Sequence, residues 1–250
     1  MKLKTDVVVH YHSVDYELPE KIDEDFAWWL GVFYGDGSVA PPKKGCNPRQ
    51  LEITCTEDEP EIMNRVIQIT KKLFDCDCKI EQDKRSKGIH VHIPGRKIVA
   101  FLELNGLLKE KSLNIAVPSA ILKASKRVKN AFISGYWDAD GTVAVKNGTI
   151  DSFRAKSISF DFIDQIETIL QTSKIDCYTS DYKGYSHYSK YHGYEITHQP
   201  CRTLRVRSNS TQLFCDLMKE SVKVQQVQEK LELGKLRIPN FRKKNRFLND

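Results

Sequence analysis

The chain has 250 residues, a net charge of +6, 40% hydrophobic and 10% aromatic residues. This composition excludes an intrinsically disordered chain, and the length suits one large domain or two of about 125 residues. No apolar stretch approaches the ~20 residues that a membrane helix needs, and the N-terminus lacks a signal-peptide pattern. We therefore expect an intracellular protein with no membrane partner, in a compartment that the sequence leaves open, and with reduced cysteines.

Basic residues gather in clusters along the chain. Residues 235–249 contain six lysines and arginines and no acid, and shorter clusters lie at 84–87, 123–129 and 202–207. A solvated surface would account for any one of these clusters, but several together favour a polyanionic partner. If the basic tail 235–250 contacts such a partner, it does so through phosphates.

The first half of the chain is predicted to alternate helices and strands. An apolar helix ends in the Asp-Gly of residues 29–37, and an amphipathic helix covers 62–73. Alternating apolar and polar residues predict strands at 50–55 and 88–94. A last helix is predicted over 99–104, so this half is predicted to contain a helix, two strands, a helix, two strands and a helix.

The second half repeats this order. A second apolar helix ends in the Asp-Gly of residues 133–141, an amphipathic helix covers 162–170, and a last helix is predicted over 213–218. The final helices are 113 residues apart, whereas the first are 104 apart, so nine extra residues lie in the hairpin region. Residues 178–198 contain six tyrosines and are predicted to form a long hairpin that follows a groove, although a ribbon packed on the body remains an alternative.

Both apolar helices carry a stripe of small residues. Alanine or glycine recurs at every fourth position, which places these residues on one face of each helix. Small residues at this spacing let two helix backbones approach closely, so we expect the two helices to pack stripe to stripe. The predicted interface residues are Ala27, Gly31, Ala131 and Gly135.

An acid stands at the end of each apolar helix. Gly37 and Gly141 fit the C′ position that ends a helix, which places Asp36 and Asp140 side by side at two helix C-termini. A carboxylate there faces the negative end of the helix dipole, and two together repel each other. Turn formation by Asp-Gly would explain one copy, but two matched copies favour a site for divalent cations.

The two runs WLGVFYGDG (residues 29–37) and ISGYWDADG (residues 133–141) resemble the paired signature of LAGLIDADG homing endonucleases. The resemblance covers about residues 20–225. It implies an α+β fold of tandem αββαββα halves, 1–125 and 126–250, related by a pseudo-twofold axis. It also implies a monomer in which the signature helices pack together and two antiparallel sheets form a saddle over DNA.

The same resemblance implies the site residues. Asp36 and Asp140 would be the metal ligands, and the carbonyls of Gly35 and Ala139 plausible additional ligands. Tyr34 replaces the first acid of the motif in the first copy, whereas Asp138 keeps it in the second; this position is not the metal ligand in the family.

The chemistry implied is the hydrolysis of one phosphodiester in each strand of double-stranded DNA, at a long, asymmetric target site and without an obligate protein partner. Mg²⁺ is the expected ion; Mn²⁺ should substitute for it, and Ca²⁺ should bind with little turnover. Family sites add a basic residue near the end of the last strand of each half. By position these are Arg96, with Lys97 as its neighbour, and Arg207, with Arg205 as its neighbour.

The sheet surfaces and basic clusters supply the predicted DNA contacts. His90 and His92 alternate along one strand, a pattern that also suits a zinc site, but base or surface contacts are favoured without further ligands. The predicted contacts are Gln50, Thr54, Lys84, Arg85, His90, His92, Lys156, Lys183, Lys190, Arg202, Arg205, Arg242, Lys243 and Lys244.

A non-cleaving nucleic-acid binder on the same scaffold is the alternative, either an RNA maturase for an intron or a transcription regulator. A pure binder has no need of the acid pair, and the sequence contains no evident separate helix-turn-helix module. The sequence therefore favours the endonuclease.

Overall fold

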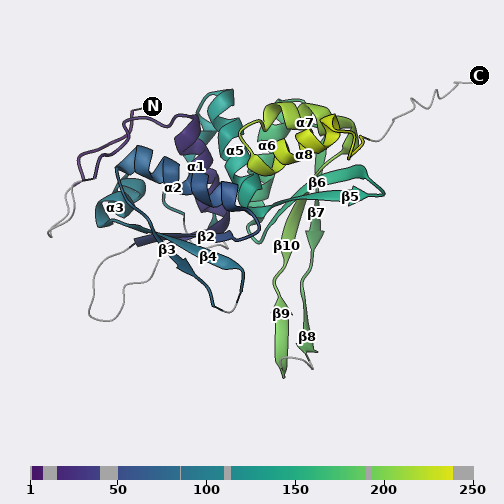
Figure 1. Cartoon of the computed structure of the whole chain (residues 1–250), viewed down its shortest axis with the longest axis horizontal. Coiled ribbons are helices and arrows are strands. Elements are labelled where there is room, and N and C mark those ends of the chain that lie inside the picture. Colours follow the sequence, from purple (N-terminus) through teal and green to yellow (C-terminus); the bar gives the residue numbers. More distant parts are fainter. Residues whose placement is uncertain are drawn as a thin grey trace, which may run out of the picture.

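A computed structural model of the chain describes residues 2–7, 16–39, 50–84, 86–109, 114–189 and 193–238. Two successive αββαββα units follow one another along the chain, with a two-stranded ribbon inserted in the second (Figure 1). The predicted α+β fold with its repeated halves is confirmed.

The described residues of the first unit form three helices and four strands. These are α1 Glu24–Asp36, β1 Gly37–Val39, β2 Gln50–Thr56, α2 Pro60–Phe74, β3 Lys79–Gln82, β4 Gly88–Pro94 and α3 Arg96–Leu104.

The second unit repeats this order and adds a short helix before it and a longer one after it. Its elements are α4 Ser119–Leu122, α5 Lys126–Asp140, β5 Gly141–Lys146, β6 Thr149–Ser157, α6 Phe160–Thr172, β7 Cys177–Tyr182, β8 Tyr185–Ser189, β9 Tyr194–His198, β10 Cys201–Val206, α7 Thr211–Leu217 and α8 Val222–Glu232.

Each unit forms one four-stranded antiparallel sheet, with the strand orders β1-β2-β4-β3 and β5-β6-β10-β7. The helices lie on one side of both sheets, above them in Figure 1, so no helix of the described residues covers the lower faces, which we call the open faces. Strands β8 and β9 pair with each other and project below the body as a ribbon. The open faces and the ribbon therefore lie on the same side of the molecule.

Alternation of apolar and polar residues decides which face of each sheet is covered. Leu51 and Ile53 of β2 and Val91 of β4 are fully buried beneath the helices, as are Leu204 and Val206 of β10. Because successive strand residues point to opposite faces, the residues between them belong to the open faces.

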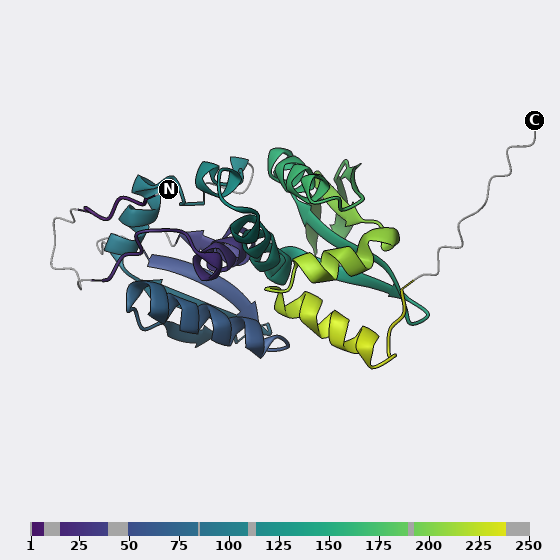
Figure 2. The same ribbon diagram turned by 90° about the horizontal axis from the view of Figure 1, so that it is seen from above.

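The two units meet through α1 and α5, which lie together in the centre of Figure 2 in purple and dark teal. A Cβ atom added at Gly31 would lie 2.0 Å from the carbonyl oxygen of Phe132, and one added at Gly135 would lie 1.9 Å from that of Trp28. Gly31 and Gly135 are 104 residues apart, as are Trp28 and Phe132, so the contact is reciprocal about a pseudo-twofold axis.

Helix α1 is buried on all sides from Phe26 to Tyr34, and α5 from Ala131 to Asp138. Ala27 and Ala131, the other two predicted interface residues, are both fully buried. Within the described ranges, no helix combines the length and the apolar character that crossing a membrane requires.

Candidate active site and nucleic-acid interface

The two acids are the last residues of the paired helices, Asp36 of α1 and Asp140 of α5. Gly37 and Gly141 end the helices in extended conformation, with φ values of −88° and −80°, so the predicted C′ caps are not left-handed. Glycine is needed for a different reason: a Cβ at Gly37 would lie 2.2 Å from the Phe33 ring, and one at Gly141 2.2 Å from the Trp137 ring. The chain thus passes directly from each helix into a strand.

The acids lie close enough to affect each other's ionisation. Burial, and next the charge of Asp140, raise the pKa of Asp36 to about 6. Burial also raises the pKa of Asp140, although the nearby lysines Lys109, Lys223 and Lys156 oppose the shift. Asp36 is exposed and Asp140 is half-buried, so the two carboxylates with raised pKa values form a site at the surface that would be stabilised by added positive charge.

A lysine is bound at the end of each helix. Lys109 Nζ donates to the carbonyl oxygens of Gly35 at 2.7 Å and Gly37 at 2.9 Å, and burial lowers the pKa of Lys109. Lys223 Nζ donates to the carbonyl oxygen of Ala139 at 3.2 Å and pairs with Glu59 at 3.2 Å. The carbonyl oxygens of Gly35 and Ala139 were predicted as metal ligands. Each of them accepts a hydrogen bond from a lysine ammonium group in this structure.

Sequence reasoning missed both lysines. Lys109 and Lys223 are 114 residues apart, one more than the 113-residue offset between Phe101 and Phe214, so the nearly repeated spacing is the only signal of the pair that the sequence offers.

The predicted basic residues lie elsewhere. Gly88, at one end of β4, shares a pocket with Asp36, whereas Arg96 follows the other end of β4, roughly 20 Å further along the strand. Arg207 lies beyond the end of β10, where it pairs with Asp176 at 3.1 Å and stacks on the Tyr178 ring. The structure brings Lys109 and Lys223 to the acids in place of Arg96 and Arg207.

Two predicted DNA contacts lie next to the acids. Thr54 shares the pocket of Asp36, and Lys156 lines a groove together with Asp140 and Lys109. The groove continues along the second sheet to Tyr185, at the base of the ribbon. Thr54 and Lys156 would therefore flank any group bound at the acid pair.

The remaining predicted contacts fall into three groups. Gln50, His90 and His92 lie on the open face of the first sheet, and Arg205 lies on that of the second. Lys84 and Lys183 are exposed, at the β3–β4 turn and at the start of the ribbon. The residues Arg85, Lys190, Arg242, Lys243 and Lys244 lie outside the described residues.

Arg202 is on the opposite face. It shares the direction of Leu204, and its guanidinium binds both oxygens of Asp164 on α6, stacks over the Phe160 ring and also bonds Asp181. Arg202 therefore holds α6 on the sheet rather than contributing to the open face, which corrects its assignment as a DNA contact.

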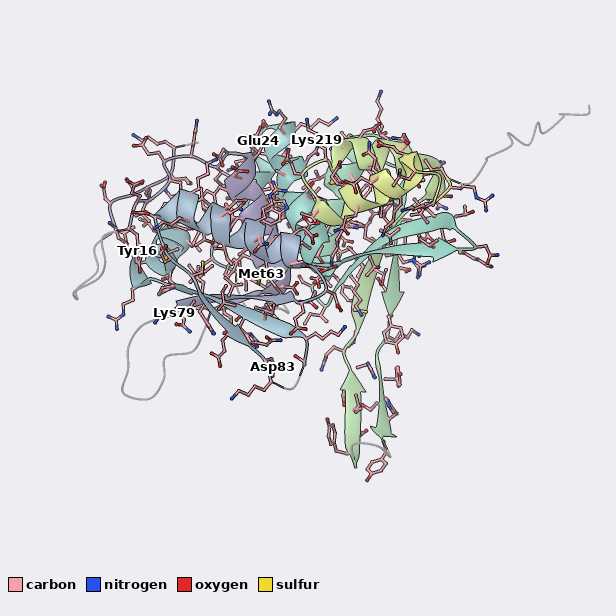
Figure 3. All side chains as sticks on the ribbon, viewed as in Figure 1. Tyr16, Glu24, Met63, Lys79, Asp83 and Lys219 are labelled. Carbon is pink, nitrogen blue, oxygen red and sulfur yellow. The ribbon has the colours of Figure 1, made fainter. Side chains whose placement is uncertain are left out.

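The side chains in Figure 3 distinguish the two sides of the molecule. Lys79 and Asp83 lie at the lower, open side of the first sheet, whereas Glu24 and Lys219 lie at the opposite, helical side. Among the described residues, no group of three or more His, Cys, Asp or Glu side chains is arranged to hold a metal, so His90 and His92 are not part of a cluster of that size there.

Asp138, the first acid of the second motif, has a structural role. It is 2% exposed and accepts hydrogen bonds from Trp28 Nε1 at 2.8 Å and from Ser221 Oγ at 2.6 Å. It also accepts from the backbone N–H groups of Val222 and Lys223, the first residues of α8. Asp138 thus fixes the start of α8, and with it the position from which the Lys223 side chain reaches Ala139.

The ribbon carries a stack of aromatic rings. The Tyr185 ring lies 4.6 Å from that of His198 and 5.4 Å from that of His187, and it meets Tyr182 edge to face at 6.0 Å. Tyr188 and Tyr194, further along, are 66% and 58% exposed. The ribbon projects from the body, which does not support the alternative of a ribbon packed on the surface (Figure 1).

Residues 127–218 match the family model of the LAGLIDADG-like domain. Among solved structures, the homing endonuclease I-DmoI in complex with DNA and calcium is similar, with a TM-score of 0.56 and 14% identity over 84% of this chain and 100% of that one. Full-length DUF199/WhiA from Thermatoga maritima gives a TM-score of 0.53 and 12% identity over 95% of this chain and 66% of that one. The chain has the LAGLIDADG fold, and the resemblance to the LAGLIDADG family found in its sequence is confirmed.

Two curated relatives come from Methanocaldococcus jannaschii. The replication factor C small subunit is 26% identical over 163 residues, which are 65% of this chain, and the probable translation initiation factor IF-2 is 29% identical over 178 residues, which are 67%. The chain spans only 8% and 14% of the lengths of these relatives.

Proposed function

We propose that the protein is a site-specific, divalent-metal-dependent endonuclease of double-stranded DNA. The observation that carries the proposal is the pair of carboxylates, Asp36 and Asp140, at the adjoining ends of α1 and α5, where burial and mutual repulsion raise the pKa of Asp36 to about 6. A folded protein gains no stability from such a pair, so we assign it a role in catalysis.

The residues present fit a hard divalent cation such as Mg²⁺. Asp36 and Asp140 offer carboxylate oxygens, and the carbonyls of Gly35 and Ala139 already accept hydrogen bonds from ammonium groups. A bound metal would neutralise phosphate charge and lower the pKa of the attacking water. Mn²⁺ should replace Mg²⁺, and Ca²⁺ should support binding with little turnover.

Lys109 and Lys223 would supply fixed positive charge on the two sides of the site. Each ammonium is anchored to a helix-end carbonyl, so each is preorganised where negative charge develops on a phosphate. Lys156, beside Asp140, would add a phosphate contact. The near-equivalent placement of Lys109 and Lys223 in the two halves supports cleavage of one phosphodiester in each strand.

Two open sheet faces and a projecting ribbon on the side of the acids provide a surface for a long duplex, and because the two faces differ in composition the target should be asymmetric. The reciprocal α1–α5 contact supplies each half with its partner helix, so we propose that the protein acts as a monomer without an obligate protein partner.

A non-cleaving nucleic-acid binder is the second candidate, and one observation favours it. Lys109 and Lys223 already place two cations next to the acid pair, which is the arrangement that a site without metal would need. An RNA maturase or a transcription regulator on this scaffold could keep the acids for that internal ion-pair network alone.

Gel-shift and plasmid-cleavage assays separate the two candidates. Target sites are selected from a randomised duplex library, and wild type, Asp36→Asn and Asp140→Asn are compared in Mg²⁺, Mn²⁺ and Ca²⁺. The endonuclease requires that wild type cleaves in Mg²⁺ and that both variants bind but lose most cleavage. Tight binding by wild type without cleavage in Mg²⁺ or Mn²⁺ would establish the binder instead.

A further inference from the structure

Among the described strand residues, the charged side chains of the two open sheet faces differ in their predominant sign. Those of the first face are two carboxylates and one lysine, together with two histidines. The second has three basic side chains and one acid. The residues of the first face are Lys79, Glu52, Glu81, His90 and His92, and those of the second are Arg154, Lys156, Arg205 and Asp151.

Glu52 lies on β2, the second strand of the first sheet, between two histidines. Its Oε1 lies 3.0 Å from His90 Nδ1 and its Oε2 lies 3.4 Å from His92 Nδ1. The side chain is 24% exposed, so these contacts hold the carboxylate on the open face with part of its surface available. The hydrogen-bond partner of Glu52 is His90, whereas His92 Nδ1 is hydrogen-bonded to Gln50 Nε2 at 3.3 Å. A carboxylate offers about four lone-pair positions, so Glu52 can accept further hydrogen bonds while its contact with His90 is kept.

Arg205 occupies β10 of the second sheet, directly opposite Arg154 of β6 and Tyr178 of β7. Its neighbours on the same strand, Leu204 and Val206, are fully buried, so Arg205 points to the open face. It lines the same groove as Lys109 and Asp140.

A carboxylate on a DNA-facing surface needs a reason, because phosphates repel it. In the major groove the amino groups of cytosine and adenine are the donors that can offset this repulsion. Adenine places the acceptor N7 beside its amino group, where it would face a carboxylate oxygen, whereas cytosine does not. The base that suits Glu52 is therefore cytosine, and the base that suits the fork of Arg205 is guanine, through O6 and N7.

We infer that, within the proposed DNA-binding function, the two halves read their half-sites by different chemistry: Glu52 selects a cytosine under the first sheet, and Arg205 selects a guanine under the second. The target is consequently non-palindromic for a chemical reason, since Glu52 offers acceptors to a base under the first sheet and Arg205 offers donors to a base under the second.

The test is selection of bound duplexes from a randomised library in Ca²⁺, so that binding and not cutting is scored. Wild type is compared with Glu52→Gln, which keeps the size of the side chain and can bond adenine N6 and N7 together. The matched control is Glu24→Gln, on the helical side of the molecule and away from both open faces (Figure 3). Arg205→Met is the second variant, and Lys219→Met on the helical side is its control.

Glu52→Gln should change the preferred base at one position of the first half-site from cytosine to adenine, by about tenfold or more, and Arg205→Met should lose the preference for guanine at one position of the other half-site. Both controls should keep the wild-type base preferences.

If Glu52→Gln folds, binds and selects the wild-type bases, the assignment of Glu52 is wrong. If Glu52→Gln does not fold, the result for Arg205→Met decides whether the proposal holds. If wild type enriches a target sequence and Arg205→Met still selects the same guanine, the proposal that the two sheets recognise bases by different chemistry is wrong, whereas the proposed DNA binding is supported. If wild type enriches no sequence, both proposals fail.

Discussion

Asp36→Asn should make the protein more stable at neutral pH while it removes activity. The pKa of Asp36 is raised from 3.8 to about 6, so the ionised carboxylate destabilises the folded state. A shift of this size corresponds to about 3 kcal/mol. Because the residue keeps contact with solvent, screening reduces the expected gain from Asp36→Asn to roughly 1–2 kcal/mol.

The pH dependence has a defined sign. The folded-state pKa lies above the unfolded one, so the cost is absent below pH 4, grows as the carboxyl ionises, and is complete above about pH 6. The stability gain of Asp36→Asn should therefore be about half of its full size at pH 5 and largest at pH 7.5. Asparagine does not titrate, so the free energy of unfolding of the variant should depend less on pH between about pH 4 and pH 6 than that of wild type.

The assay is urea denaturation of wild type and variant in EDTA at pH 5, 6, 7 and 7.5. Asp151→Asn is the control, because the hydrogen bond from Arg154 lowers the pKa of Asp151 and its replacement should give no stabilisation. Added Mg²⁺ should stabilise wild type more than Asp36→Asn. The reasoning is refuted if Asp36→Asn is no more stable than wild type at pH 7.5, or if its advantage does not increase with pH.

Three further predictions concern the helix interface, the buried acid and the lysines. Gly135→Ala places a Cβ 1.9 Å from the Trp28 carbonyl oxygen, so it should cost at least about 3 kcal/mol or prevent folding, and a melting temperature equal to that of wild type would contradict the interface. Asp138→Asn directs an amide at groups that donate to the carboxylate, so it should cost roughly 2–3 kcal/mol by denaturation and reduce cleavage through misplacement of Lys223, whereas unchanged stability and cleavage would count against that role. Lys109→Met and Lys223→Met should each retain binding in gel shifts and lose cleavage, with Lys219→Met as the control; full cleavage by either would exclude that lysine from the reaction.

The repeat could be read from the sequence because its signals are local and occur twice. The small residues at four-residue spacing predict the close approach that Gly31 and Gly135 make, and the alternating residues predict the sheet faces. The positions of Asp36 and Asp140 follow from the helix ends.

The basic residues of the site could not be found in the same way. Lys109 lies between α3 and α4, and Lys223 lies in the first turn of α8, so neither belongs to the repeated strands that sequence reasoning examined. Their place beside the acids depends on how the chain returns to the helix ends after each sheet, which is a tertiary contact. Arg202 was misassigned because the alternation on β10 turns it towards α6.

Because the two halves belong to one chain, helices α1 and α5 can carry different residues at equivalent positions. At the position of Trp28, α5 has Phe132, and at the position of Asp138, α1 has Tyr34. Two copies of the second half could still bring their backbones together at Gly135, but each Asp138 would then face a phenylalanine and lose the indole donor that Trp28 now provides. The hydrogen bond from Trp28 to Asp138 therefore favours pairing of the two different halves over pairing of two copies of the second half.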